Sequence, residues 1–175
     1  MQQPMVSYIA LGSNLGNPIQ QLHEALLAID QLHKTYLLAY SSFYQSAPMG
    51  PKDQPAYINA VAKIHTQLSP LTLLDKLQAI ENQQGRERKE HWGARTIDLD
   101  IVLYDHTIMQ TERLTLPHYG AKERDFVLTP LAEISPRLVF PDGESIGQAL
   151  KNCTHYNLEK IDLKKVNLDK ITIKD

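Results

Sequence analysis

The sequence of 175 residues contains one cysteine, Cys153. A single thiol cannot form a disulfide within the chain, which is typical of reducing compartments and predicts a cytoplasmic protein. The sequence also lacks an apolar stretch of about 20 residues, the length that spans a bilayer. No basic segment followed by a long apolar run stands near the N-terminus, so we expect no signal peptide and no membrane partner.

An excess of basic residues is absent as well. Lys and Arg together number 18 against 20 for Asp and Glu, which leaves a formal net charge of -2. A chain with this balance has no overall positive field that would attract nucleic acid. Nucleic acid is therefore not an expected partner, and any recognition of phosphate must come from a local group of side chains.

Glycine-rich phosphate loops are missing too. Neither the Gly-Lys-Ser/Thr ending of a P-loop nor a G-x-G-x-x-G motif occurs in the sequence. Gly12 and Gly16 enclose three residues after a short apolar run. This arrangement favours a turn between a strand and a helix over a phosphate loop.

The most informative stretch is GRERKEHWGARTIDLDIVLY, residues 85–104. Its second half alternates like a strand, with Ile97, Leu99, Ile101 and Leu103 on one face and Asp98, Asp100, Val102 and Tyr104 on the other. Residues two apart on a strand lie roughly 6–7 Å from one another at the backbone, so the carboxylates of Asp98 and Asp100 can converge on a hard cation.

The alternative interpretation of this Asp-x-Asp pattern, and the more frequent one, is a strand face exposed to solvent without a function in binding. Acids on a mostly apolar strand are costly unless a positive group meets them. The loop that enters the strand supplies cations and an aromatic ring, in Arg86, Arg88, Lys89, His91, Trp92 and Arg95. Acids and guanidinium groups side by side indicate a site for Mg²⁺ and phosphate.

Hydrophobic periodicity predicts alternating strands and helices. Strands are expected over residues 5–11, 35–44, 56–66 and 96–104. Helices are expected over residues 18–33, 70–84 and 126–134, with a small one at residues 146–150. Asn17 followed by Pro18 is a typical helix start, and Ser69 followed by Pro70 is another.

This order of elements predicts the fold. Strand, helix, strand, strand, helix, strand is the order of a ferredoxin-like α/β sandwich, an α+β fold with a mainly antiparallel sheet and packed helices. The length suits one domain. We expect that domain over residues 1–156, and residues 157–175 as a C-terminal extension that is either an added strand or a loosely ordered tail.

Two further polar residues have open interpretations. Asn59 stands between Ile58 and Ala60 in a predicted strand, where a hydrogen-bonded core amide and a ligand contact are equally good explanations. His118 follows Pro117 in a segment without periodicity. An isolated histidine of this kind is more often a surface residue than a ligand contact.

Several local patterns together resemble one family, the 6-hydroxymethyl-7,8-dihydropterin pyrophosphokinases of folate biosynthesis. The resemblance covers roughly residues 5–150 and is most specific in the Arg-Thr-x-Asp-Leu-Asp-Ile strand after Trp-Gly. The segments that carry it are YIALGSNL (8–15), SSFY (41–44), GPKDQPAYIN (50–59), ENQQGRER (81–88), WGARTIDLDIVL (92–103), LTLPHY (114–119) and FPDG (140–143).

The resemblance implies the reaction and its participants. Members transfer pyrophosphate from ATP to the hydroxymethyl group of the dihydropterin and release AMP, on a ferredoxin-like core. Two Mg²⁺ ions are expected on Asp98 and Asp100. The expected partners are ATP and the pterin, two small molecules, and we expect the protein to act as a monomer.

The resemblance also implies roles for individual residues. The catalytic residues would be Arg86, Arg95, Asp98 and Asp100. The pterin would contact Ser46, Ala47, Met49, Tyr57, Asn59, Asp98 and Phe126, with the rings of Tyr57 and Phe126 on its two faces. ATP would contact Gln78, Glu81, Arg88, Trp92, Arg95, Ile101, Arg113, Thr115, His118, Tyr119 and Arg124.

Two other functions compete with this hypothesis. A metal-dependent phosphohydrolase or nucleotidyltransferase would use the same pair of acids, but it would release other products. A ferredoxin-like RNA-binding module would share the order of elements. The near-neutral charge and the acids on the candidate site face both disfavour RNA.

Overall fold

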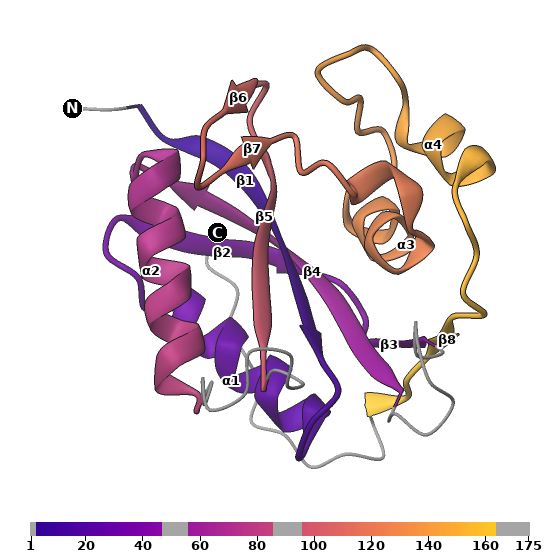
Figure 1. Cartoon of the computed structure of the whole chain (residues 1–175), viewed down its shortest axis with the longest axis horizontal. Coiled ribbons are helices and arrows are strands. Elements are labelled where there is room, and N and C mark those ends of the chain that lie inside the picture. Colours follow the sequence, from indigo (N-terminus) through magenta and orange to yellow (C-terminus); the bar gives the residue numbers. More distant parts are fainter. Residues whose placement is uncertain (1–2, 47–55, 86–95, 164–175) are drawn as a thin grey trace.

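The computed structural model describes residues 3–46, 56–85 and 96–163 of the chain. Within these residues the main sheet has six strands in the order β5-β1-β4-β3-β8, and β2 also pairs with β4 (Figure 1). The strands are β1 (Met5–Ser13), β2 (Thr35–Tyr40), β3 (Tyr44–Ser46), β4 (Tyr57–Thr66), β5 (Asp98–Tyr104) and β8 (Glu159–Lys160).

All strand pairs of this sheet are antiparallel. The central strand β1 lies between β5 and β4, and β2 and β3 follow one another along the far edge of β4. This is the strand order of a ferredoxin-like sandwich. The predicted fold class is therefore confirmed.

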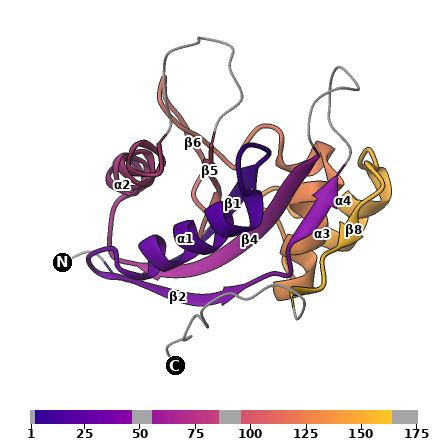
Figure 2. The ribbon, with the colours of Figure 1, turned by 90° about the horizontal axis from the view of Figure 1, so that it is seen from below.

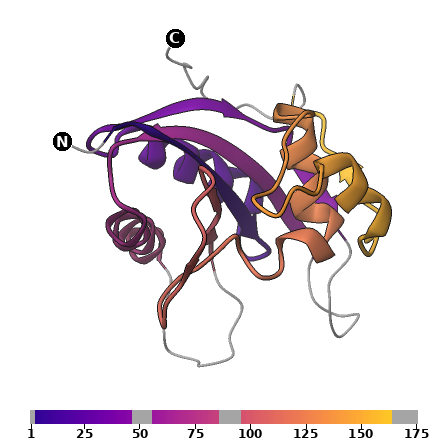
Figure 3. The same ribbon diagram turned by 90° about the horizontal axis from the view of Figure 1, so that it is seen from above.

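Helices cover both faces of the sheet (Figures 1 and 3). One buried cluster joins α1 (Pro18–Asp30) and α2 (Pro70–Gln83) to the first face, and a second cluster joins α3 (Asp125–Ile134) and α4 (Ile146–Asn152) to the other. Helices α1 and α2 begin at the predicted residues, after the N-caps Asn17 and Ser69. Asn17 Oδ1 accepts a hydrogen bond from Gln20 N (3.3 Å), and Ser69 Oγ accepts one from Thr72 N (3.3 Å).

The strand predicted over residues 35–44 is two strands. The ladder of β2 ends at Tyr40. Ser41 N still donates a hydrogen bond to Val61 O (2.9 Å), but the return bond from Val61 N goes to the side chain of Ser41 and not to a backbone carbonyl. The Oγ of Ser41 accepts this hydrogen bond from Val61 N (2.9 Å) and donates one to Ser42 O (2.8 Å). Residues 41–43 therefore form a bend, after which β3 pairs with the start of β4.

The alternation predicted along β5 is wrong beyond Val102. The pairing of β1 with β5 shifts register between Tyr8 and Ile9, so Val102 is the extra residue of a bulge. As a result Leu103 joins Val102 in the cluster under α3, and Tyr104 joins the cluster under α1 and α2. The bulge leaves Asp98 and Asp100 on the predicted face.

Shorter elements complete the described chain. They are the hairpin of β6 (Met109–Gln110) and β7 (Thr115–Leu116), and a 3₁₀ turn at Ala121–Glu123. The described part of the C-terminal extension adds β8 to the edge of β3 (Figure 2). Across residues 3–46, 56–85 and 96–163, no helix has the length and apolarity that a membrane crossing requires.

A cluster of polar side chains connects α3 to β3 and to the residues just before it. Glu133 of α3 accepts hydrogen bonds from Tyr44 Oη (2.5 Å), Ser42 N (3.0 Å) and Ser42 Oγ (2.8 Å). Partial burial opposes ionisation of Glu133, but these hydrogen bonds and the charge of Lys160 hold the pKa of its carboxyl below the ordinary value. Burial and the neighbouring carboxylate raise the pKa of the Tyr44 phenol.

Glu133→Gln is expected to lower the free energy of unfolding by roughly 1 kcal/mol at pH 7, because a charged acceptor is replaced by a neutral one. A carboxyl whose pKa is depressed on folding stabilises the fold above its unfolded pKa of about 4.3, and this contribution is lost as the pH falls through the folded value. The difference between the two proteins should therefore shrink as the pH falls below about 4.3 and vanish once the pH is below the folded pKa of Glu133. Urea unfolding across pH 3–7 measures it, with Glu112→Gln as a control at an exposed glutamate, and a pH-independent difference would contradict the assignment.

Candidate active site

A cavity lies on the sheet face that carries α3, beyond the N-terminal end of that helix. Its volume is about 240 Å³. Strands β1, β4 and β5 line its floor, and the segment from His118 to Val127 forms one wall. The lining residues are Ala10, Leu11, Gly12, Ser46, Tyr57, Asn59, Asp98, Asp100, Val102, His118, Gly120, Ala121, Arg124, Phe126 and Val127.

Most of the predicted site residues that the structure describes meet in this cavity. On one side lie Ser46 of β3 and Tyr57 and Asn59 of β4, and on the other lie Asp98 and Asp100 of β5. The opposite wall contributes the remaining ones, which are His118, Arg124 and Phe126. Segments more than 60 residues apart in the chain thus place acids, cations, an amide and aromatic rings around one space.

Strand register places Gly12 at the centre of the floor. It pairs with Asp98 on β5 and with Asn59 on β4, so these residues form a row across three strands. Asp100 pairs with Ala10 in the neighbouring row. Because Gly12 and Ala10 are small, the floor stays open between the acids and the amide.

Sequence reasoning missed this role of Gly12. It assigned the residue to a turn, whereas β1 continues to Ser13. A Cβ atom at Gly12 would lie 3.0 Å from Asn59 Oδ1, closer than side chains normally approach. A glycine at the end of a strand pattern is a signal of such close approach, and it was available in the sequence.

The side chain of Asn59 is buried and oriented by a neighbour. Its Nδ2 donates a hydrogen bond to Ser46 Oγ (3.0 Å), and both residues are less than 10% exposed. Ser46 belongs to β3 and pairs with Tyr57 at the start of β4. The amide is therefore held at the cavity edge by the sheet, and the structure supports both interpretations offered by the sequence, since a hydrogen-bonded amide of the core also lines the cavity.

His118 is held beside β5 through its backbone and its ring. Its N–H donates to Val102 O (2.9 Å), and its Nδ1 accepts a hydrogen bond from Gly120 N (3.1 Å). A neutral imidazole with an accepting Nδ1 carries its proton on Nε2, which is thus a donor for an anionic oxygen. The ring of Tyr119 stacks on it with 4.7 Å between centroids, but Tyr119 is 79% exposed and does not line the cavity.

Arg124 and Phe126 form the wall opposite the sheet edge of β3. The guanidinium carbon of Arg124 lies 5.7 Å from the centroid of the Phe126 ring, within the range of a cation–π contact. Both residues stand at the start of α3, whose position over the sheet is set by the apolar cluster beneath it. A cation and an aromatic face are therefore offered together to the cavity.

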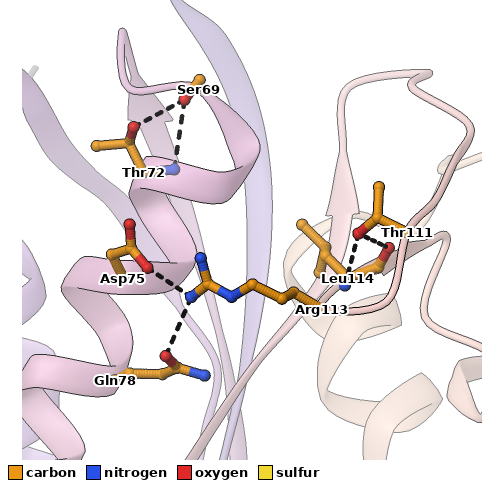
Figure 4. Close-up of polar contacts among 7 residues, drawn as sticks. All are labelled: Ser69, Thr72, Asp75, Gln78, Thr111, Arg113 and Leu114. Atoms are coloured by element: carbon orange, nitrogen blue, oxygen red, sulfur yellow. Dashed lines mark hydrogen bonds and ion pairs between the residues drawn. The ribbon is translucent and has the colours of Figure 1, made fainter.

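The predicted nucleotide contacts on α2 and the β6–β7 hairpin lie outside this cavity. Arg113 Nη2 donates to Asp75 Oδ1 (2.5 Å) and to Gln78 Oε1 (3.3 Å), and so joins the loop before β7 to α2 (Figure 4). Thr115 belongs to β7, where it pairs with Gln110. The structure brings Gln78 and Arg113 together, and their contact with ATP stays a prediction.

Two other predicted nucleotide contacts have structural roles of their own. Glu81 is buried, and its Oε2 accepts a hydrogen bond from Leu99 N (2.9 Å), the residue between the two acids of β5. Glu81 therefore positions the strand that carries Asp98 and Asp100. The side chain of Ile101 lies in the core under α1 and α2, on the other face of the sheet, so only its backbone can approach a ligand in the cavity.

Six predicted site residues lie outside the described residues. They are Ala47 and Met49 on the pterin side, and Arg86, Arg88, Trp92 and Arg95 on the nucleotide side. Their predicted roles therefore stay predictions.

The two acids of β5 suit a magnesium ion that also binds a substrate. Asp98 is half-buried, Asp100 is exposed, and both line the cavity. In the described part of the chain, no three His, Cys, Asp or Glu side chains gather as a metal site. Mg²⁺ is commonly held by one or two carboxylates together with substrate phosphates and water, so this donor set fits it.

A comparison with protein families decides between the candidate functions. A profile of the family "7,8-dihydro-6-hydroxymethylpterin-pyrophosphokinase (HPPK)" matches residues 8–136. This chain belongs to the HPPK family. The matched range contains every residue that lines the cavity, from Ala10 to Val127.

Individual relatives agree with the family. The chain is 55% identical over 157 residues to the 2-amino-4-hydroxy-6-hydroxymethyldihydropteridine pyrophosphokinase of Haemophilus influenzae, covering 90% of this chain and 98% of the relative. It is 47% identical over 154 residues to the protein of the same name from Pseudomonas aeruginosa, covering 88% and 95%. Pyrophosphokinases of this kind are diphosphokinases, and this HPPK-family chain is an enzyme of that type.

Solved structures confirm the fold. A structure of an HPPK-DHPS in complex with substrates superposes with a TM-score of 0.69 over 86% of this chain, at 13% identity. A structure of Plasmodium falciparum HPPK-DHPS with pteroate superposes with a TM-score of 0.65 over 86% of this chain, also at 13% identity. This chain spans less than half of either solved chain, 45% and 42%. At this identity the likeness concerns the fold alone.

Proposed function

We propose that this chain transfers pyrophosphate from ATP to the hydroxymethyl group of 6-hydroxymethyl-7,8-dihydropterin in folate biosynthesis, giving AMP and the pterin diphosphate. The observation that carries the proposal is the cavity itself. Two carboxylates suited to Mg²⁺ line it beside a buried amide, Asp98 in the same row as Asn59 and Asp100 in the neighbouring row, and they share the cavity with the ring of Phe126 and the cationic or donor side chains of Arg124 and His118. Family membership supports the reaction class.

The reaction joins the hydroxymethyl oxygen to the β-phosphorus of ATP. The bond between that phosphorus and the oxygen bridging to the α-phosphate breaks, AMP leaves with the electron pair, and the alcohol loses its proton. A primary alcohol is a poor nucleophile at neutral pH. The residues of the site must therefore act by positioning the two substrates and by neutralising phosphate charge.

The pterin fits the side of the cavity between β4 and α3. Asn59, held by Ser46, offers its amide to the donor and acceptor edge of the ring system, and the rings of Tyr57 and Phe126 lie on the cavity lining where a flat ring would be enclosed. Ala47 and Met49 are proposed to complete this pocket. Since Gly12 separates Asn59 from Asp98, the hydroxymethyl group would extend over Gly12 toward the acids.

The phosphates of ATP fit the side of His118 and Arg124. The Nε2–H of His118 and the guanidinium of Arg124 are donors for phosphate oxygens. We propose that Arg86 and Arg95 neutralise charge on the transferring group. The rest of the nucleotide is proposed to contact Gln78, Glu81, Arg88, Trp92, Ile101, Arg113, Thr115 and Tyr119.

Asp98 and Asp100 are proposed to hold two Mg²⁺ ions, and their carboxylates fit that role as described above. When bound, the ions would neutralise phosphate charge and lower the pKa of the hydroxymethyl oxygen. Asp98, the more buried of the two acids, lies in the same row as Gly12 and Asn59 and so faces the pterin side as well. Asp100, which pairs with Ala10 in the neighbouring row, is more exposed to solvent.

The direct test incubates the protein with Mg²⁺, ATP and 6-hydroxymethyl-7,8-dihydropterin and separates the nucleotide products. AMP should form in equal amount to the pterin diphosphate, and neither ADP nor free phosphate should accumulate. ADP as the product would indicate transfer of a single phosphoryl group. Release of phosphate without a modified pterin would indicate a phosphohydrolase.

Gly12→Ala is expected to raise the KM for the pterin roughly tenfold, because the new Cβ would meet Asn59 Oδ1 at 3.0 Å and displace an amide that is tied to Ser46. The KM for ATP should stay within about twofold. Gly147→Ala is the matched control, since a Cβ at Gly147 meets no atom within 4 Å. Equal pterin KM values for Gly12→Ala and the native protein would show that the side-chain amide of Asn59 does not contribute to pterin binding.

We also propose that the enzyme is a monomer that acts in the cytoplasm. The single cysteine supports a reducing compartment. Size-exclusion chromatography with light scattering tests the first statement, with a mass near 19.9 kDa as the expected value for the monomer.

A further inference from the structure

The chain that follows α4 runs along both walls of the proposed pterin pocket. It begins at Cys153, passes the N-terminal end of α3, and ends as β8 on the edge of β3 (Figures 1 and 2). Of residues 153–163, the part of this segment that the structure describes, none lines the cavity. The contacts of the segment nevertheless fall on the elements that carry Phe126 and Ser46.

The first group of contacts lies at the start of α3. Asp125 N donates to Thr154 O (3.2 Å), and Thr154 N donates to Glu123 O (3.2 Å). Asp125 is only 4% exposed, and its Oδ2 accepts a hydrogen bond from Tyr156 N (3.0 Å). The backbone of Tyr156 is therefore fixed against the first residue of α3 by a buried carboxylate.

This anchorage brings the ring of Tyr156 against that of Phe126. The two centroids are 5.3 Å apart and the ring planes make an angle of 64°, which is an edge-to-face pair. The guanidinium of Arg124 lies 5.7 Å from the same Phe126 ring. The ring of Phe126, which is only half-buried, thus has two neighbours that restrict its rotation.

The second group of contacts lies at β3. Lys160 pairs with Tyr44 and Glu159 with Gln45, and Ile161 N donates to Phe43 O (2.8 Å). The next residue of β3 is Ser46, which holds Asn59. One continuous segment therefore connects the aromatic wall of the cavity to its amide wall.

We infer that Tyr156 is a positioning residue for the pterin site. Its ring holds the Phe126 ring in the orientation that binds the pterin. The inference rests on the proposed function for the identity of the ligand. Tyr156 acts through Phe126 and touches neither substrate nor the acids of β5. A ring fixed before binding loses less freedom on binding, so the effect falls on pterin affinity and not on the chemical step.

The experiment compares Tyr156→Leu and Tyr156→Phe with the native protein. Titration calorimetry measures the Kd of the pterin in the presence of Mg²⁺ and a non-hydrolysable ATP analogue, and steady-state kinetics give kcat and both KM values. We expect Tyr156→Leu to weaken pterin binding about 3- to 10-fold, the range that corresponds to loss of an aromatic pair. Tyr156→Phe keeps the ring and should stay within about twofold of the native protein.

A double-mutant cycle separates positioning from general stability. In a Phe126→Leu background, Tyr156→Leu should have no further effect on the pterin Kd, because the ring that it positions is gone. Lys151→Ala, at an exposed residue of α4, is the control variant. If Tyr156→Leu does not fold, Tyr156→Met provides the same cycle, since it also removes the ring and keeps an apolar side chain.

Three outcomes with the variants would overturn the inference. They are an unchanged pterin Kd in folded Tyr156→Leu, an equal loss in Tyr156→Phe, and an additive loss in the Phe126→Leu background. A native protein that binds the pterin but makes no AMP would refute the proposed reaction while leaving the cycle interpretable. A native protein that binds no pterin would refute both.

Discussion

Asp98→Asn and Asp100→Asn are each expected to lower kcat by about a thousandfold or more. Without the carboxylate, Mg²⁺ would be held less well, and the negative charge on the phosphates in the transition state would no longer be neutralised. The change keeps the size of the side chain and removes one negative charge. Initial rates of AMP formation at saturating substrates, with Mg²⁺ varied, measure the loss. Added Mg²⁺ should restore little of the rate, since an amide is a weak ligand for this ion.

The fold should survive these substitutions. Both acids line a cavity, and removing charge at such a place is expected to change the free energy of unfolding by no more than about 1 kcal/mol. Asp105→Asn is a matched control, because Asp105 follows the same strand and has a positive φ of 48° that asparagine also adopts. A rate near that of the native protein in either Asp98→Asn or Asp100→Asn would remove the acids from the mechanism.

Asn59→Leu is expected to raise the KM for the pterin about 100-fold, while the KM for ATP stays within about twofold. Leucine keeps the branching and the number of heavy atoms of the side chain and removes both its donor and its acceptor. The polar edge of the pterin would then lose its partner inside a cavity from which water is largely displaced. Steady-state kinetics with each substrate varied in turn measure the two KM values.

Ser46→Ala separates orientation of the amide from direct recognition. It removes the hydrogen bond from Asn59 Nδ2 but leaves the amide in place, so we expect a smaller rise in the pterin KM, about tenfold. Asn152→Leu, at the exposed end of α4, is the control. If Asn59 is only a core amide, Asn59→Leu will change the free energy of unfolding and leave the pterin KM unaltered.

Local sequence rules were sufficient for most elements of the fold. Helix starts depend on a few adjacent residues, and the caps Asn17 and Ser69 with their following prolines act as predicted. The acids of β5 fall on one face because strand alternation is also a local property. The family resemblance then supplied residues for the site that no local pattern singles out, such as Tyr57 and Phe126.

The errors occurred where a distant partner changed the local pattern. The strand predicted over residues 35–44 divides because Ser41 bonds to Val61, twenty residues away. The alternation of β5 reverses at Val102 because β1 pairs with a bulge there. Neither partner can be read from the segment itself, since each is fixed only when the sheet is assembled.

The sequence by itself determined the helix starts, the order of the strands, the pair of acids on β5 and, through resemblance, the family and most of the cavity lining. Only the tertiary structure decided the place of Gly12, which is central because β4 and β5 both pair with it. It also showed that Glu81 accepts a hydrogen bond from Leu99 N and that the ring of Tyr156 packs against the ring of Phe126. These are contacts between elements far apart in the chain, and they depend on packing distances of a few ångströms that no periodicity encodes.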